Sequence, residues 1–203
     1  MRVHYSGISH MPNSPTAITA RPPKRQRLID SAGELIHEQG VQRTTLAQIA
    51  ERADVPAGNV YYYYKTRDEL VHAVIESRLD MIRGLLGRLD RRSAPKARLK
   101  ALAASWTEAA PEVKEHGCPV GSLACELSKD DNALSADGAR MMREILDWVE
   151  RQFRELGRRD APALAVTMLA SIQGAALLAN TLRDEDLMHR EIRRIRRWVD
   201  DVA

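Results

Sequence analysis

The chain has 203 residues, of which 44% are hydrophobic and 29% charged, and its formal net charge is +3. This composition is typical of a soluble globular protein and excludes a chain that is disordered throughout. Its two cysteines cannot form a disulfide framework, so we expect a reducing, cytoplasmic environment. A net charge of +3 is too small to indicate a nucleic-acid partner by itself.

The first 27 residues carry five basic side chains and no acidic one. Residues 1–22 are rich in Ser, Pro, Thr and His and lack an apolar run of signal-peptide length. We therefore expect a disordered basic tail rather than a targeting signal. Such a tail is compatible with contact to a DNA backbone but is also common elsewhere. Either Met1 or Met11 can be the start of translation.

Between residues 24 and 39 the apolar side chains recur at the spacing of one helix face, and Gly40 follows as a helix-ending residue. They are Leu28, Ile29, Ala32, Leu35 and Ile36. Thr45 and Gln48 then form the pattern of a capping box, which predicts a second helix that ends near Arg52. A three-residue connection leads to Pro56, which suits the first turn of a short third helix over 56–63. Two short helices joined in this way predict a helix-turn-helix.

The rest of the chain predicts further helices and no strand, so the expected fold class is all-α. Thr66 and Glu69 form a second capping-box pattern before a long helix over 67–91. Pro residues and Gly117 separate the later helices. We expect one helix that begins at Pro95 and ends before Pro111 or shortly after it, and further helices over 119–128, 134–156, 161–182 and 185–202.

The third predicted helix has the chemistry of a DNA-reading element. Small residues at Ala57 and Gly58 allow close approach to a duplex, and Asn59 can bond a base or a phosphate. The tyrosine hydroxyls, Lys65 and Arg67 can contact phosphates. Four consecutive tyrosines cannot share one helix face, because neighbours lie about 100° apart. We expect Val60 and Tyr64 to point inward, and Tyr62 and Tyr63 to point outward.

The run from Thr44 to Ala50, together with that from Ala53 to Leu70, resembles the DNA-binding domain of the TetR family of bacterial transcriptional repressors. The resemblance covers about residues 24–72 and implies an all-α homodimer. Its N-terminal domain would bind a palindromic double-stranded DNA operator, and its C-terminal domain would bind a small effector and dimerise. The implied DNA contacts are Thr44, Thr45, Ala57, Gly58, Asn59, Tyr61, Tyr62, Tyr63 and Arg67. Pro56 replaces a common Ser, and Tyr64 replaces the usual Phe, so its hydroxyl needs a partner.

The resemblance divides the chain into three parts. Residues 1–22 are the tail, 23–68 the helix-turn-helix domain and 69–203 the ligand-binding and dimerisation domain. The segment from Gly117 to Leu127 resembles one C-terminal subgroup of these repressors, some of which sense oxidants or electrophiles through the Cys of the Gly-Cys pair. An alternative function is therefore thiol sensing through Cys118, whose thiolate a helix N-terminus and protonated His116 would favour.

Cys118 and Cys125 are seven residues apart, on a similar helix face, and too far apart for an easy disulfide. Their spacing with His116 fits no structural zinc site, so we expect no metal and no cofactor. The resemblance places the effector pocket among apolar side chains of the central helices, although ordinary core packing explains the same pattern. The candidate pocket residues are Met81, Trp106, His116, Cys118, Met141 and Trp148.

The uncharged stretch 161–182 is long enough to span a bilayer, but it is Ala-rich, contains polar residues and lacks aromatic residues at its ends. We expect a helix buried on most faces and no membrane partner. Its small residues permit close helix approach, so helices 161–182 and 185–202 are predicted to form the homodimer interface. The Arg-rich last helix is interpreted as a solvated face.

The sequence disfavours two other classes of protein. An enzyme is disfavoured because no nucleophile–base pair, phosphate loop or metal cluster stands out. A helical interaction module without DNA binding is disfavoured by the intact tyrosine–lysine segment.

Overall fold

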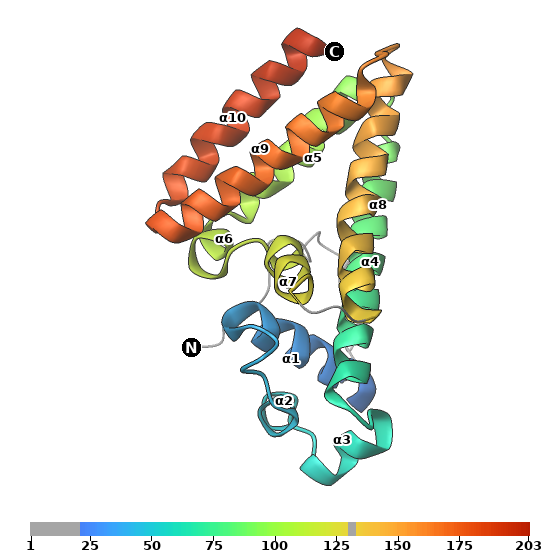
Figure 1. Ribbon diagram of the computed structural model, residues 1–203, viewed down its shortest axis with the longest axis vertical. Coiled ribbons are helices and arrows are strands. Elements are labelled where there is room, and N and C mark those ends of the chain that lie inside the picture. Colours follow the sequence, from blue (N-terminus) through green and yellow to red (C-terminus); the bar gives the residue numbers. More distant parts are fainter. Residues whose placement is uncertain (1–20, 130–132) are drawn as a thin grey trace. The chain divides into compact units, whose positions relative to one another are not determined.

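The computed structural model describes residues 21–129 and 133–203 (Figure 1). The predicted tail, apart from Arg21 and Pro22, lies outside the described residues. The described part of the chain is helical and contains no strand, which confirms the all-α prediction. Its helices are α1 (Lys24–Gln39), α2 (Leu46–Arg52), α3 (Ala57–Tyr63), α4 (Arg67–Asp90), α5 (Pro95–Glu108), α6 (Ala110–His116), α7 (Pro119–Leu127), α8 (Ala133–Glu155), α9 (Ala161–Leu182) and α10 (Glu185–Val202).

The helix predicted to begin at Pro95 is α5, which ends before Pro111, one of the two ends that the sequence allowed, but a second helix, α6, follows it and was not predicted. They are separated at Ala109, two residues before Pro111 in the first turn of α6. Proline has no backbone N–H, so it cannot donate the bond that would continue α5. The third helix also begins one residue later than predicted, because Pro56 caps it with a non-helical ψ of 134°.

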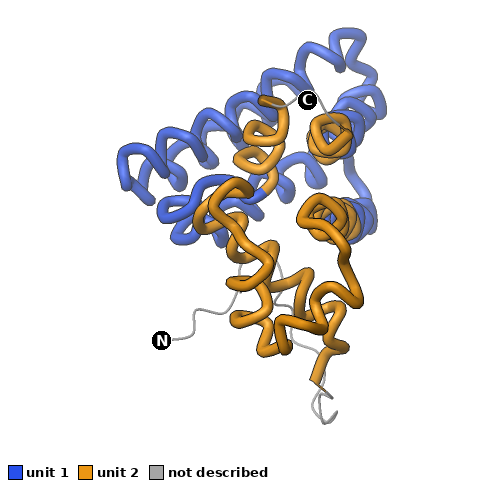
Figure 2. The backbone as a smooth tube through the Cα atoms, turned by 60° about the horizontal axis from the view of Figure 1, so that its bottom comes forward, with its two compact units in different colours: residues 1–13, 82–119, 143–203 blue, residues 14–81, 120–142 orange. Residues whose placement is uncertain are grey.

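The described chain forms two compact units, coloured separately in Figure 2. The N-terminal unit contains residues 21–81, 120–129 and 133–142, and the C-terminal unit contains residues 82–119 and 143–203. Helices α4 and α8 each contribute to both units. The units therefore interleave along the chain, whereas the sequence analysis placed its domain boundary at 68/69.

The N-terminal unit is organised around the buried face of α1. This face is the apolar set that the sequence predicted, and Leu28 and Ala32 are fully buried. Buried side chains of α2, α3 and α4 complete the core, among them Ile49, Val60 and Ile75. Arg78 of α4 is also buried and donates from Nη2 to the carbonyl oxygen of Gly33, 3.2 Å away. A buried guanidinium with a carbonyl partner fastens α4 to α1.

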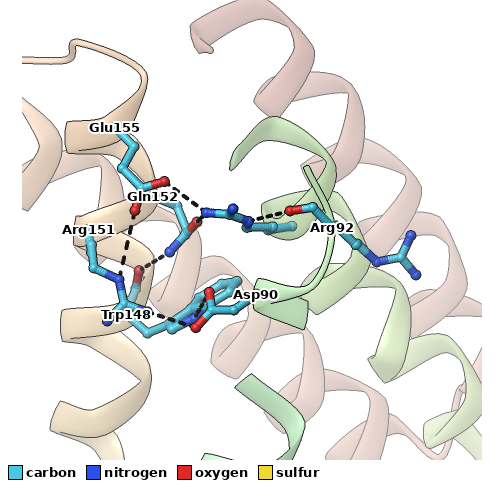
Figure 3. Close-up of polar contacts among 7 residues, drawn as sticks. Asp90, Arg92, Trp148, Arg151, Gln152 and Glu155 are labelled. Carbon is cyan, nitrogen blue, oxygen red and sulfur yellow. Dashed lines mark hydrogen bonds and ion pairs between the residues drawn. The ribbon is translucent and has the colours of Figure 1, made fainter. Parts of the chain in front are cut away.

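Polar contacts join α4, α5 and α8 inside the C-terminal unit (Figure 3). The Trp148 indole N–H donates to Asp90 Oδ1 at 2.9 Å, and Arg151 pairs with Asp90 Oδ2 at 3.1 Å. Arg98 donates to Gln152 Oε1 at 3.1 Å and to Glu155 Oε2 at 2.8 Å. Gln152 is fully buried, so its amide is satisfied internally, as buried polar groups generally are.

In the same unit α10 packs against both α5 and α9. Ile192, Ile195 and Val199 are buried on the inner face of α10. The rings of Phe153 and Trp198 meet edge to face, with centroids 6.0 Å apart. The outer face of α10 is exposed and charged, which agrees with its interpretation as solvated.

Helix α9 differs from the expectation of burial on most faces. Its buried residues, such as Ala165, Met168 and Ile172, lie on one face. Val166 and Leu177 are exposed on the opposite side, and Leu178 and Leu182 are exposed on its flank and toward the C-terminal end. The helix therefore offers an apolar surface that the core of a single chain does not use.

Candidate nucleic-acid interface

The capping box predicted at the start of α2 is present. Thr45 Oγ1 accepts from the Gln48 amide at 3.3 Å, and the Thr45 amide donates to Gln48 Oε1 at 2.9 Å. Both bonds satisfy amides that have no partner inside the helix. Ile49 and Ala50 turn the other side of this helix into the core. The first residue of the helix-turn-helix is thereby set by local chemistry.

The turn between α2 and α3 spans four residues, 53–56. The Val55 amide donates to the Ala50 carbonyl at 2.9 Å, and the Val55 side chain is buried. Asp54 adopts a left-handed conformation with φ of 50°, which Asp tolerates better than most residues. Its carboxylate pairs with Arg21 and lies 3.7 Å from Arg27 Nη1. The second capping-box pattern is met in part: Thr66 Oγ1 accepts from the Glu69 backbone amide, but the Glu69 carboxylate accepts from the backbone amide of Lys65 and not from that of Thr66.

The tyrosine run of α3 divides between core and surface. Val60 and Tyr64 are buried, which confirms the inward prediction. Tyr62 is 79% exposed and Tyr61 57%, whereas Tyr63 is half-buried with its ring 5.1 Å from that of Tyr62. The expectation that Tyr63 would be the second outward tyrosine was therefore wrong. Helix geometry places residues 61 and 63 symmetrically about the inward direction, so only tertiary packing separates them.

The N-terminal turn of α3 is open. Ala57 and Gly58 are exposed and Asn59 is half-buried. No heavy atom lies within 4 Å of where a Cβ would stand on Gly58. A helix whose first turn carries small exposed residues can enter a major groove closely, because no side chain holds its backbone away from the base edges.

The two basic residues that follow α3 differ in solvent exposure and in their bonding partners. Lys65 is exposed and its Nζ donates to the Tyr61 carbonyl at 2.9 Å, which holds the ammonium beside the exposed tyrosines. Arg67 is half-buried, with Nη1 3.5 Å from the Val41 carbonyl oxygen and Nε 3.9 Å from Asp68 Oδ1. Both cations lie at the end of α3, where phosphate contacts help to position a recognition helix.

Thr45 is exposed, but Thr44 is 2% exposed and its hydroxyl donates to the Gly40 carbonyl at 2.7 Å. The Thr44 side chain thus has an internal role, and a DNA contact from it stays a prediction.

Tyr64 is 4% exposed, and its buried hydroxyl has no hydrogen-bond partner among the described residues. Burial raises the pKa of Tyr64, although the positive charge of Arg25 acts in the opposite direction.

Glu126, the one charged residue of α7, was not predicted as a functional residue from the sequence. Its carboxylate accepts from the Val41 and Gln42 amides, directly before the helix-turn-helix. A single acid in an otherwise uncharged helix was the available signal, but its partners are 84 and 85 residues away in sequence.

The residues predicted for an effector pocket are distributed over both units. Met81 and Met141 belong to the N-terminal unit, whereas Trp106, His116, Cys118 and Trp148 belong to the C-terminal unit. Met141, Cys118 and Trp148 are buried, Met81 and Trp106 are half-buried, and His116 is exposed. That these six residues line an effector pocket remains a prediction.

The two cysteines do not share a helix face, contrary to expectation. Cys118 is buried and precedes α7, whereas Cys125 is exposed on that helix. Cys118 lies outside α7, directly before its first residue, so helical spacing does not fix its direction relative to Cys125. Within the described residues no group of His, Cys, Asp and Glu side chains is arranged to hold a metal ion.

The fold and the exposed face of α3 define a helix-turn-helix DNA-binding regulator. Residues 28–74 match the family of bacterial regulatory proteins called the tetR family, and residues 95–193 match the transcriptional regulator LmrA/YxaF-like C-terminal domain. The chain belongs to the TetR family of transcriptional regulators. Members of this family are DNA-binding regulators and not enzymes.

Individual relatives agree with this assignment. An uncharacterized HTH-type transcriptional regulator of Lactococcus lactis is 27% identical over 81% of this chain and 87% of its own length. The crystal structure of a TetR regulatory protein from Rhodobacter sphaeroides has a TM-score of 0.75 at 27% identity, covering 86% of this chain and 97% of that one. A TetR regulator from Legionella pneumophila shares the fold, with a TM-score of 0.79, 18% identity, and coverage of 89% and 97%.

Proposed function

We propose that this protein is a cytoplasmic, ligand-responsive repressor that binds a palindromic operator as a homodimer and leaves it when a small effector binds. The observation that carries the proposal is the exposed surface of α3, formed by Ala57, Gly58, Tyr61 and Tyr62 with Lys65 at its end. Small residues for groove entry, hydroxyl donors and an ammonium are together the chemistry of a recognition helix.

The exposed side of α9 supports the dimer. The helix carries no charged residue, and four of its large apolar side chains are exposed. Its window of highest hydropathy has a mean of 1.6 and is 33% buried, so by length and composition the helix could also cross a membrane. One such helix is weak support for a membrane protein in a family of DNA-binding regulators. A second copy of the chain covers the same surface by self-complementary packing.

Release by an effector requires that the effector bind more tightly to a conformation that does not fit the operator. The candidate pocket residues remain those of the sequence analysis, from Met81 to Trp148. Reversible ligand binding is preferred over thiol sensing because Cys118 is 5% exposed, and reaction with a dissolved oxidant requires an accessible thiolate.

Fluorescence anisotropy with a duplex from the region upstream of the gene tests the proposal. The protein is titrated against this duplex and a scrambled duplex at two salt concentrations. We expect tight binding to the upstream duplex that survives the higher salt, and weak, salt-sensitive binding to the scrambled one. Equal, weak binding to both would contradict an upstream operator.

Two variants sharpen this measurement. Tyr62→Ala removes the most exposed tyrosine of α3 and is expected to weaken specific binding about tenfold, which corresponds to the loss of one good contact. Thr107→Ala changes an exposed residue of α5 and serves as the control, with no expected effect. If both variants bound the upstream duplex as tightly as wild type, Tyr62 would not contribute to operator reading.

A further inference from the structure

The Glu126 carboxylate of α7 binds two consecutive backbone amides of the turn between α1 and α2. Oε2 accepts from the Val41 amide at 2.9 Å, and Oε1 accepts from the Gln42 amide at 3.1 Å. Successive amides that point the same way form a positively polarised concavity, and a carboxylate bound there makes charge-assisted bonds. Both carboxylate oxygens of Glu126 therefore accept hydrogen bonds from the backbone of one turn.

Gly40 permits this arrangement for two reasons. Its φ of 85° lies in the left-handed region and turns the chain out of α1. A Cβ at this position would lie 3.0 Å from Glu126 Oε2 and 3.2 Å from Oε1. Glycine thus leaves the space that the carboxylate fills, and any other residue would press against it.

The same turn is bonded from its other side and leads directly into α2. The Gly40 amide donates to the Ile36 carbonyl at 2.8 Å, and the Thr44 hydroxyl donates to the Gly40 carbonyl at 2.7 Å. Thr45, which follows at once, is the N-cap of α2. The capping box sets the residue at which α2 begins, and the position of the turn sets where that residue lies in space.

Helix α7 is itself packed within the N-terminal unit. A Cβ at Gly138 of α8 would lie 3.3 Å from Leu127 Cδ1 and 3.5 Å from Ala124 Cα, so α7 and α8 approach closely there. The chain passes from the C-terminal to the N-terminal unit at the start of α7, between residues 119 and 120. Glu126 therefore links α7 to the turn that precedes the DNA-reading helices. Helix α7 is in turn joined through the backbone to residues of the C-terminal unit.

We propose that Glu126 is a positioning residue for DNA recognition: it fixes the turn at residues 40–42 to α7 and thereby couples the position of α7 to that of α2 and α3. This inference rests on the proposed function and extends it to the way in which operator binding is controlled. The carboxylate does not contact DNA; it acts through the backbone of the turn.

Glu126→Ala in the full-length chain tests the proposal, with Glu126→Gln as the conservative variant. Glu108→Gln on α5 is the matched control, because it removes the same charge from an exposed residue. Amide hydrogen exchange of Val41, Gln42 and residues 46–52 is followed at a temperature where every variant is folded by circular dichroism. We expect exchange about tenfold faster in Glu126→Ala, an intermediate change in Glu126→Gln, and none in the control.

Anisotropy on the upstream and scrambled duplexes is then measured with the same proteins. We expect Glu126→Ala to lose about tenfold in affinity for the upstream duplex and little for the scrambled one. Unchanged exchange at residues 41, 42 and 46–52 would overturn the proposal. A lower melting temperature with an unchanged ratio of the two affinities would also overturn it, since that is the signature of a purely stabilising contact. If the wild-type protein bound neither duplex specifically, the proposed function would fail while the exchange data still decided the role of Glu126.

Discussion

At the scale of single residues, Tyr64 shows a conflict between local chemistry and packing. Its ring fills the core behind α3, and the Arg25 guanidinium lies 5.7 Å from the ring centroid. Its hydroxyl is buried without a hydrogen-bond partner among the described residues. An unsatisfied buried polar group costs about 1–3 kcal/mol, so this hydroxyl destabilises the folded chain.

Tyr64→Phe is accordingly expected to stabilise the protein by about 1 kcal/mol, because it removes the unsatisfied hydroxyl and keeps the ring. For a chain of this size that corresponds to an increase in melting temperature of about 2–4 °C. Thermal unfolding followed by circular dichroism measures it. Tyr62→Phe, at a position 79% exposed, is the control and should leave the melting temperature unchanged. A lower melting temperature for Tyr64→Phe would show that the hydroxyl is satisfied, for example by water.

At the scale of secondary-structure elements, caps decide where several helices begin. Thr45 caps α2 with the predicted reciprocal bonds. Asp184 caps α10, where Oδ1 accepts from the Leu187 amide at 3.0 Å and Oδ2 accepts from Arg190 at 3.0 Å. The Leu187 amide, followed by Arg190, lowers the pKa of Asp184 below its usual value.

This lowered pKa predicts a pH-dependent contribution of Asp184. Because the folded state binds the proton more weakly than the unfolded state, the stabilisation is fully present above the ordinary Asp pKa. It is lost as the pH falls through the lower pKa of the folded state. Asp184→Ala should therefore lower the melting temperature at pH 7, and the difference from wild type should shrink on acidification below about pH 4.

Thermal unfolding of wild type and Asp184→Ala between pH 7 and pH 3 checks this prediction. Asp201→Ala, which changes an exposed residue near the other end of α10, is the control for loss of an acidic side chain from this helix. A difference between Asp184→Ala and wild type that stayed constant over this range would mean that the carboxylate charge does not cap the helix.

At the scale of the whole molecule, the exposed apolar side of α9 determines the expected assembly. Leu177 is 65% exposed and lies in a stretch without any charged side chain. A charge placed there would be buried without a partner in a self-complementary interface, at a cost that a dimer of ordinary size does not tolerate.

Leu177→Asp is expected to convert a dimer into a monomer, measured by size-exclusion chromatography with light scattering. The monomer should also lose affinity for a palindromic operator, because one recognition helix reads only one half-site. Thr107→Asp introduces the same charge at an exposed position of α5 and should leave the mass unchanged. A dimeric Leu177→Asp protein would place the interface elsewhere.

The local signals of the helix-turn-helix were readable before the structure. The capping box of Thr45, the helix-ending Gly40 and the inward pair Val60 and Tyr64 all depend on neighbours within four residues in the chain. Helix periodicity and hydrogen-bond geometry act at that range, so spacing alone predicts them. Pro111 indicated the end of the helix before it, but α6 itself was not predicted, although Pro is tolerated in the first turn of a new helix.

What the sequence by itself determined is thus the all-α class, the helix-turn-helix and the family resemblance. Tertiary structure alone decided that Tyr61 rather than Tyr63 is exposed, that Thr44 is buried, and that Cys118 and Cys125 face differently. It also decided that Glu126 binds a turn far away in the sequence. These outcomes depend on which surfaces meet when distant segments pack, and the pattern of a single helix contains no information about its partner.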